Sequence, residues 1–497
     1  MTNLSGVLSD AARARPDTAA VVHNGLSRTF AELDGLSARA ATLLVDQGVR
    51  PGDRVALVLP NSVEFLVLYY AILRAGAVVV PMNPLLKARE IEHHLTDGEV
   101  GLVCTDGRTL EEVRSAIEGL EKPPRVLTAG ALPAAVAVLA PQAEPVDRAD
   151  GDTAVILYTS GTTGQPKGAE LTHGSLACNA VAFIEATELR PGDVLFAALP
   201  LFHVFGLVCL VGAAVRAGAR LALVERFDAG AALDLIDAQR VSVFVGVPTM
   251  FAALLAARRE GDTSLRLAVS GGAAMPQPLA REFAAAMGAP VLEGYGMSET
   301  SPIVSVNLPG DRGRPGSVGR PIAGVAVRVV DDLGASLPAG EVGEVEVRGH
   351  NVMKGYWRRP ASTAEVLYDG WLSTGDLGRL DEDGFLYIVD RKKDLVIRGG
   401  FNVYPREIED VLHEHPAVAE AVVVAVPHES LGEEVAAAVV LGPGRTASAD
   451  ELREFVKSRV APYKYPRHVW LLDELPKGAT GKILRREVAA AAREGAL

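Results

Sequence analysis

The stretch Tyr158-Thr-Ser-Gly-Thr-Thr-Gly-Gln-Pro-Lys-Gly168 decides how the rest of this chain is interpreted. Residues 153–159, which lead into it, are apolar or small and predict a buried strand. Beyond them the apolar periodicity stops, and hydroxyl side chains alternate with glycines before Lys167. Glycines let backbone N–H groups approach an anion closely, hydroxyls add donors, and a lysine adds positive charge. The loop therefore predicts phosphate binding, with a Gly/Thr-rich surface turn as the alternative. It is not a Walker loop, because Lys167 is followed by glycine rather than Ser or Thr.

Composition narrows the class of protein. A chain of 497 residues with 48% hydrophobic residues predicts about three folding units with large cores. Its 62 acidic and 49 basic residues give a net charge of −13, which argues against a nucleic-acid partner. The chain has three cysteines, Cys104, Cys178 and Cys209, and they lie far apart in the sequence. We therefore expect neither a disulfide framework nor a metal cluster, and we expect a cytoplasmic location. The N-terminus has no recognisable signal peptide.

An uncharged segment, 194–215, is long enough to span a bilayer. It contains Pro200, Gly206 and Gly212, and no aromatic belt flanks it. We therefore predict a buried strand, a turn and the start of a helix there, and at most peripheral contact with a membrane.

Strands and helices alternate through most of the chain. Expected strands at 54–59, 77–80 and 100–104 are separated by helices, one of them capped by Ser62, and this order predicts a parallel sheet covered by helices. Further strands are expected at 195–199, 243–247 and 267–269, and 121–152 is interpreted as a surface connection. Several of these strands end in loops rich in Gly, Thr or His, and ligands of such sheets lie beyond the carboxyl ends of the strands. No G-x-G-x-x-G follows a strand, so a dinucleotide site is not indicated.

The pattern changes after residue 316. Residues 325–330 and 343–348 alternate with period two, which predicts a half-buried antiparallel sheet. The charge run Arg391-Lys-Lys-Asp394 interrupts apolar sequence, and a small α+β region follows, with a helix that begins at Pro405. We therefore predict an α/β protein with a large domain, 1–389, of parallel α/β subdomains plus a β-rich subdomain. A small mobile domain, 390–497, would follow.

Five segments together resemble motifs of the acyl-adenylate-forming superfamily. Beside the 158–168 loop they are Gly294-Tyr-Gly-Met-Ser-Glu-Thr300, Ser373-Thr-Gly-Asp376, Asp390-Arg-Lys-Lys-Asp394, and the segment from Pro476 to Lys482. They occur in the family's order and cover almost the whole chain. The family includes acyl-CoA synthetases, 4-coumarate-CoA ligases, luciferases and the adenylation domains of peptide synthetases. At position 390, where many members of the family have glycine, this chain has Asp, and this form of the motif is similar to that of the fatty-acyl branch.

The resemblance implies a two-step reaction that uses ATP, Mg²⁺ and coenzyme A. A carboxylate attacks the α-phosphate of ATP to give acyl-AMP and pyrophosphate, and a thiol then takes the acyl group and releases AMP. Such chemistry requires positioning and charge neutralisation more than covalent help. Lys482 is expected to place its charge between the carboxylate and the α-phosphate, which predicts a loss of about 10²-fold or more without it. For Lys477, which lies in the same motif, a solvated position on the surface is as good an explanation as a role in the reaction.

The remaining site residues follow from the same resemblance. The nucleotide would be bound by Thr159, Ser160, Gly161, Thr162, Thr163, Gly164, Lys167, Gly271, Gly272, Ala273, Gly294, Tyr295, Gly296, Met297, Asp376 and Arg391. Within that set Tyr295 would stack on adenine, and Asp376 would accept from the ribose hydroxyls. Thr159 and Glu299 would hold Mg²⁺, which prefers oxygen ligands. Thr300 and His203 are further catalytic candidates, although His203 is also compatible with a core histidine. The small domain would turn at Lys393 and bring Gly399 and Gly400 to the thiol tunnel.

The expected acid is apolar. Its pocket would be lined by Phe202, Phe205, Cys209, Val247 and Pro302, which carry no fixed charge. An ammonium group on the acid would require an acidic side chain as its partner, and a second carboxylate would require a basic one. Arg216 lies well beyond the Pro-Leu-Phe-His segment that ends at His203. A medium- or long-chain fatty acid fits best, and an aryl or arylpropenoic acid next. Coenzyme A is the expected acceptor, with an acyl carrier protein as the alternative. A non-catalytic acyl- or nucleotide-binding module on the same fold is disfavoured by the presence of Lys482, Glu299 and Asp376.

Overall fold

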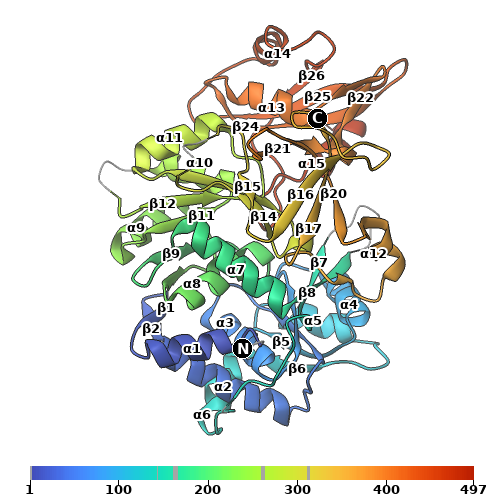
Figure 1. Ribbon diagram of the computed structural model, residues 1–497. Coiled ribbons are helices and arrows are strands. Elements are labelled where there is room, and N and C mark those ends of the chain that lie inside the picture. Colours follow the sequence, from blue (N-terminus) through green and yellow to red (C-terminus); the bar gives the residue numbers. More distant parts are fainter. Residues whose placement is uncertain (1–2, 143, 160–165, 259–262, 311–313, 497) are drawn as a thin grey trace.

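The computed structural model describes residues 3–142, 144–159, 166–258, 263–310 and 314–496. Within these ranges the strands form four sheets. Figure 1 shows them arranged from the blue N-terminal elements at one end of the molecule to the orange and red C-terminal elements at the other.

The first sheet contains the two strands, β7 and β8, that flank the Gly/Thr-rich stretch of 158–168. Its strands lie in the order β18 (Gly355–Tyr356), β8 (Lys167–Thr172), β7 (Thr153–Thr159), β4 (Val78–Met82), β3 (Arg54–Val58), β5 (Val100–Thr105) and β6 (Arg125–Thr128). Strands β7, β4, β3, β5 and β6 are mutually parallel, which confirms the predicted parallel sheet. Helices α3 (Val63–Arg74), α4 (Ala88–Asp97) and α5 (Leu110–Ile117) connect them. The Ser62 hydroxyl accepts from the Phe65 N–H at 3.1 Å and so caps α3, as predicted.

The predicted surface connection over 121–152 is partly wrong. It contains β6, the 3₁₀ turn η1 (Ala129–Ala131) and helix α6 (Leu132–Ala137). Strand β6 pairs with β5 through only four residues, and its sequence, Arg-Val-Leu-Thr, is too short for an alternating pattern to stand out.

The second sheet lies against the first through a shared core. Its order is β15 (Arg320–Pro321), β14 (Ile303–Val306), β13 (Val291–Gly296), β12 (Leu267–Ser270), β11 (Val243–Gly246), β9 (Val194–Ala197), β10 (Arg220–Leu223), β1 (Ala19–His23) and β2 (Leu26–Thr29). Its helices are α1 (Gly6–Ala14), α2 (Phe30–Asp46), α7 (His173–Thr187), α8 (Ala213–Ala217), α9 (Ala229–Gln239), α10 (Pro248–Ala257) and α11 (Gln277–Met287). One cluster of buried side chains joins both sheets, from Leu57 of β3 to Leu195 of β9.

The uncharged segment 194–215 lies inside this second unit. It forms β9, a turn, the π-helical segment η2 (Phe205–Gly212) and the start of α8. This confirms the predicted strand, turn and helix. In the described part of the chain, no helix is both long and apolar enough to cross a bilayer.

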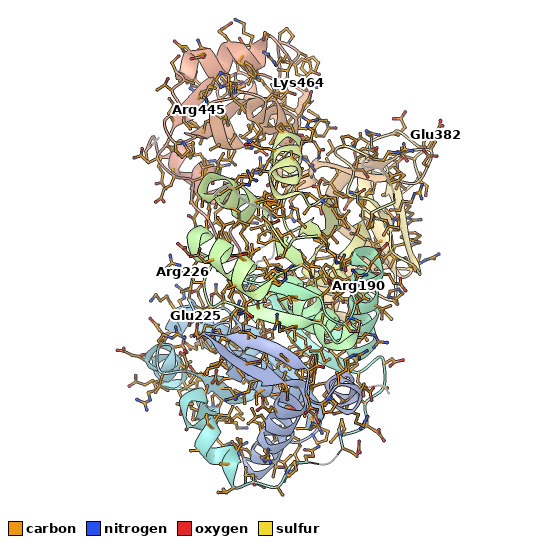
Figure 2. All side chains as sticks on the ribbon, turned by 90° about the vertical axis from the view of Figure 1, so that its left-hand side faces the viewer. Arg190, Glu225, Arg226, Glu382, Arg445 and Lys464 are labelled. Carbon is orange, nitrogen blue, oxygen red and sulfur yellow. The ribbon has the colours of Figure 1, made fainter. Side chains whose placement is uncertain are left out.

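The third sheet is antiparallel, as the period-two pattern predicted. It consists of β16 (Val325–Val330), β17 (Gly343–Gly349), β20 (Trp371–Leu380), β19 (Leu367–Tyr368) and β21 (Leu386–Arg391), with α12 (Pro360–Val366) beside it. Glu382, labelled in Figure 2, marks the turn between β20 and β21.

The fourth sheet forms the C-terminal layer and has buried clusters of its own. It contains β22 (Val396–Arg398), β23 (Phe401–Val403), β24 (Val418–His428), β25 (Gly432–Leu441) and β26 (His468–Leu471), with α13 (Pro405–His413), α14 (Ala449–Lys457) and α15 (Arg485–Arg493). Figure 2 shows Arg445 and Lys464 on this layer. A large domain of α/β and β-rich parts followed by a smaller one confirms the predicted fold class. The boundary at residue 390 stays a prediction, and the change from the third sheet to the fourth between Arg391 and Val396 supports it.

Candidate active site

A cavity of about 650 Å³ lies where the carboxyl ends of β7, β11, β12 and β13 meet β20 and the segment before α15. It collects residues from all five motifs. The predicted site residues that line it are Thr159, Lys167, His203, Phe205, Cys209, Val247, Gly271, Gly272, Gly294, Tyr295, Gly296, Met297, Glu299, Pro302, Asp376, Arg391, Lys393 and Lys482. Ser160, Gly161, Thr162, Thr163 and Gly164 lie outside the described residues.

Other predicted residues are described but do not line the cavity: Phe202, Ala273, Thr300, Gly399 and Gly400. Thr300 is fully buried, and its hydroxyl lies 2.5 Å from the Pro302 carbonyl oxygen and accepts from the Met297 N–H at 3.0 Å. In this structure it therefore shapes the turn after η3 (Ser298–Thr300), and a catalytic role stays a prediction. Gly399 and Gly400 form the turn between β22 and β23, with positive φ at both residues.

Glu299 is at the centre of a small polar cluster. Its side chain is 7% exposed, and its Oε1 accepts hydrogen bonds from the Tyr356 hydroxyl at 3.0 Å and the Thr159 hydroxyl at 3.3 Å. The register of the antiparallel pair β7–β8 places Lys167 directly opposite Thr159. The hairpin thus brings a hydroxyl and an ammonium group to the same end of the cavity as Glu299.

A second cluster joins Tyr295, Asp376 and Arg391. The Tyr295 hydroxyl donates to Asp376 Oδ2 at 2.6 Å, and Arg391 Nε lies 3.0 Å from Oδ1 of the same carboxylate. Burial, followed by the charge of Asp376, holds the pKa of Tyr295 well above its usual value. The third sheet and β13 of the second sheet are therefore linked through a fixed carboxylate at the cavity wall.

Lys482 enters the cavity from the C-terminal segment. The Thr249 hydroxyl donates to the carbonyl oxygen of Gly481 at 3.3 Å, which docks this segment on the start of α10. Gly481 has φ +75°, and a Cβ there would meet Thr249 and Val247 at 3.1 Å, so both the conformation and the close approach favour glycine.

The ammonium group of Lys482 makes no hydrogen bond or ion pair within the residues whose structure is described. Lys482 is one of the residues that line the cavity, and its side chain keeps exposed surface. Loss of hydration there, followed by repulsion from Arg391, lowers the pKa of Lys482 to about 8. Burial, followed by the charge of Lys482, lowers the pKa of His203 to about 4. At neutral pH His203 is therefore mostly uncharged, and Lys482 is mostly protonated and positively charged.

The part of the cavity lined by residues within 183–272 and 302–306, which we call the apolar end, is apolar. Lining residues there include Phe183, Leu199, Val204, Phe205, Cys209, Val247, Val269, Pro302, Ile303 and Val306. Among the described lining residues, none between 183 and 272 or between 302 and 306 is Asp, Glu, Lys or Arg. A Cβ on Gly271 would meet the Phe205 ring at 3.0 Å, so the glycine allows this ring to lie against the end of β12.

Comparison with known proteins identifies the family. The description "AMP-binding enzyme" matches residues 8–357, and "AMP-binding enzyme C-terminal domain" matches residues 407–482. The chain belongs to the AMP-binding enzyme family. The family resemblance drawn from the five motifs is therefore confirmed.

Individual members of the family differ in the acids for which they are named. The chain is 37% identical to a long-chain-fatty-acid–CoA ligase of Bacillus subtilis (strain 168), over 98% of this chain and 94% of that protein. It is 41% identical to a feruloyl-CoA synthase of an Amycolatopsis species, over 96% of each. The crystal structure of ATP-bound MatB from Rhodopseudomonas palustris superposes with a TM-score of 0.93 at 37% identity, over 99% of both chains.

Several lining residues of this AMP-binding enzyme are absent from the sequence-based prediction. They are Phe183, Glu344, Tyr356, Glu365, Thr374 and Thr480, among others. Thr374 lies inside the motif Ser373-Thr-Gly-Asp376, so the assignment of Asp376 to the site could have indicated that Thr374 lies there as well. Tyr356 lies in a two-residue strand with no periodic pattern, and it reaches the cavity because β18 pairs with the edge of β8.

The donor set near Glu299 fits Mg²⁺. A carboxylate and a hydroxyl are hard oxygen ligands, and Mg²⁺ in nucleotide sites takes one or two carboxylates plus phosphate oxygens and water. Among the described residues there is no group of three or more His, Cys, Asp or Glu that could hold a metal by itself. A cation here would therefore take most of its ligands from the nucleotide and from water.

Proposed function

We propose that this AMP-forming acyl-CoA synthetase activates an apolar carboxylic acid, a medium- or long-chain fatty acid, with ATP and transfers it to coenzyme A. In the first step a carboxylate oxygen bonds to the α-phosphorus while the bond to pyrophosphate breaks. In the second step the thiol sulfur bonds to the acyl carbon while the bond to AMP breaks. The products are the acyl thioester, AMP and pyrophosphate.

The charged end of the cavity supplies the groups for the first step. Lys482, with no protein partner for its ammonium group among the described residues, is available to neutralise charge between the carboxylate and the α-phosphate. Lys167 would contact the phosphates, and Thr159 and Glu299 would hold Mg²⁺, which when bound neutralises phosphate charge. Tyr295 would lie against adenine. Asp376 and Arg391, which already contact each other, would bind the ribose.

The second step would use another position of the small domain, about a pivot at Lys393. The charges on either side of that residue support this assignment. Lys392 pairs with Asp332 and Glu344 of the large domain at 3.1 Å each, whereas Asp394 lies 3.7 Å from Arg485 of the small domain. With its neighbours anchored to opposite domains, Lys393 is the residue whose backbone can rotate while both anchors stay intact. That rotation would withdraw Lys482 and bring Gly399 and Gly400 toward the thiol.

The observation that carries the choice of acid is the apolar end of the cavity. A second carboxylate or an ammonium group on the acid would be desolvated there without a partner, because Arg216 does not line the cavity and His203 is uncharged. The Bacillus subtilis relative named for long-chain fatty acids supports the proposal. The Amycolatopsis relative named for feruloyl-CoA favours an arylpropenoic acid as the second candidate. A carrier-protein acceptor remains the alternative to coenzyme A, and we propose a cytoplasmic enzyme with at most peripheral membrane contact.

Pyrophosphate release tests the acid and the acceptor together. The assay supplies ATP and Mg²⁺ with fatty acids of graded chain length, benzoate, cinnamate, an amino acid or a dicarboxylate, each with and without coenzyme A. We expect multiple turnovers only with coenzyme A and a maximum at one fatty-acid length. A maximum at cinnamate would replace the fatty acid by an aryl acid. Strong turnover of amino acids or dicarboxylates alone would overturn the proposal. A single-turnover burst that coenzyme A does not relieve would indicate another acceptor.

A further inference from the structure

Tyr356 belongs to a segment that is held beside the phosphate-binding hairpin although it lies far away in the sequence. In the β18–β8 pair Tyr356 is opposite Ala169, and the N–H of Trp357 donates to the Gly168 carbonyl oxygen at 2.7 Å. The Trp357 indole N–H donates to the Asp97 carbonyl oxygen at 3.1 Å. The backbone at Tyr356 is thus fixed by contacts that do not involve its own side chain.

The Tyr356 side chain contacts two groups of opposite charge in the cavity. Its hydroxyl donates to Glu299 Oε1 at 3.0 Å, and the ammonium group of Lys167 lies 5.4 Å from its ring centroid. A cation at this distance over an aromatic face is attracted by the ring. No ion pair joins Lys167 to Glu299 among the described residues.

The two oxygens of Glu299 differ in their surroundings. Oε1 accepts from both Tyr356 and Thr159, whereas Oε2 makes no hydrogen bond within the described part of the chain. Oε2 is also not among the buried side-chain atoms that lack a partner, so it retains accessible surface. Because Glu299 lines the cavity, this leaves one carboxylate oxygen available to a cation there.

We propose that Tyr356 is a positioning residue for the Mg²⁺–nucleotide site. Its hydroxyl fixes Glu299 so that Oε2 is presented to the metal, and its ring holds Lys167 apart from Glu299, so that each remains free for its own ligand. Without the ring, Lys167 and Glu299 can pair and neutralise each other. The inference rests on the proposed use of ATP and Mg²⁺ at this cavity and does not depend on which acid is activated.

Binding of nucleotides measured by calorimetry tests this role apart from turnover. Tyr356→Phe removes the hydrogen bond to Glu299 and keeps the ring under Lys167. We expect it to weaken binding of ATP in the presence of Mg²⁺ by about 10-fold, the usual effect of losing a hydrogen bond to a charged group. Binding of AMP without metal should stay unchanged. Tyr356→Leu also removes the ring and should weaken Mg²⁺–ATP binding further.

A double-mutant cycle with Glu299→Gln identifies the partner through which Tyr356 acts. If the tyrosine acts through Glu299, Tyr356→Phe has no further effect in the Glu299→Gln background. Tyr368→Phe is the matched control. Its hydroxyl also donates to a glutamate, Glu346, yet neither residue lines the cavity, so nucleotide binding should be unchanged.

The outcomes separate this inference from the proposed function. Absence of Mg²⁺-dependent ATP binding in the unmodified protein would remove the proposed use of the nucleotide. Normal binding by the unmodified protein and equal binding by Tyr356→Phe would overturn the role of Tyr356 alone. Equal weakening of AMP and Mg²⁺–ATP binding would also overturn it, because that result is the signature of a general structural defect.

Discussion

The apolar end of the cavity is built from residues within 183–272 and 302–306, which belong to the second sheet and its helices, whereas the charged end takes side chains from segments beside all four sheets. Phe205 and Cys209 are continuous with the largest buried core. Thr159, Glu299, Asp376 and Lys482 meet only because separate units are docked together. The first arrangement can change only by repacking a core, whereas the second can be taken apart by moving one domain. We therefore expect substitutions at the apolar end to alter the choice of acid, and substitutions at the charged end to alter the rate of adenylation.

The largest expected effect is at the charged end. Lys482→Ala should slow acid-dependent exchange of pyrophosphate into ATP by about 10²-fold or more, because the carboxylate and the phosphate would repel each other without the cation. Thioester formation from supplied acyl-AMP and coenzyme A should be little affected. Lys477→Ala is the control, since Lys477 pairs with Glu420 at 2.6 Å and does not line the cavity. Exchange by Lys482→Ala within a few fold of the unmodified enzyme would refute this role.

At the apolar end, Gly271→Ala tests whether the Phe205 ring limits the acid. The added methyl group would meet the ring at 3.0 Å and force it to move, and such overpacking costs about 1–3 kcal/mol. We expect kcat/KM for the best acid to fall about 10-fold while the KM for ATP changes much less. In β5, Gly101→Ala adds a Cβ that meets nothing within 4 Å and should change neither value. A rise in the KM for ATP alone would instead support the nucleotide-binding role that the family resemblance implies for Gly271.

The pH dependence of adenylation tests the contribution of the charged end of the cavity without any substitution. Since the pKa of Lys482 is lowered to about 8, its charge is present below pH 8 and lost as the pH rises through that value. The profile of kcat/KM reports groups of the free enzyme, so adenylation should fall about fourfold between pH 7 and pH 8.5. The transfer step from supplied acyl-AMP should not show this decline. A flat adenylation profile to pH 9 would contradict the assignment.

The last effect concerns stability rather than catalysis, at the contact between the second sheet and the C-terminal layer. Burial raises the pKa of Glu293 in β13 to about 7, against the attraction of Arg406 in α13. The folded protein therefore binds more protons than the unfolded chain between about pH 4.5 and pH 7, so stability falls as the pH rises through this window. The loss is at most about 3.5 kcal/mol, because one pKa unit corresponds to about 1.4 kcal/mol.

Glu293→Gln cannot ionise and should remove this part of the pH dependence. Thermal unfolding at pH 5 and pH 8 measures it as a smaller decrease in Tm for the variant than for the unmodified protein. Glu282→Gln, on the exposed face of α11, should behave like the unmodified protein. An identical decrease in Tm for Glu293→Gln would mean that Glu293 does not contribute.

Local patterns predicted the elements that their own residues stabilise. The cap at Ser62, the strand 153–159 and the period-two strands of the third sheet needed no distant partner to be identified. Strand β1 was not predicted, and it joins the second sheet by pairing with β10, some 200 positions later in the chain. Strand β2, which pairs with β1 in a hairpin, begins with two exposed residues, so its sequence has no clear alternation of apolar and polar side chains.

The sequence by itself determined the family, the α/β class and about half of the residues that line the cavity, because the motifs place hydroxyls, glycines and charges at fixed spacings along single segments. Only the tertiary structure decided that Lys482 lies in the cavity, that the Thr300 hydroxyl is engaged in a turn, and that Tyr356 stands between Lys167 and Glu299. These arrangements depend on strand pairing and domain docking between segments far apart in the chain, and local propensity carries no information about such contacts.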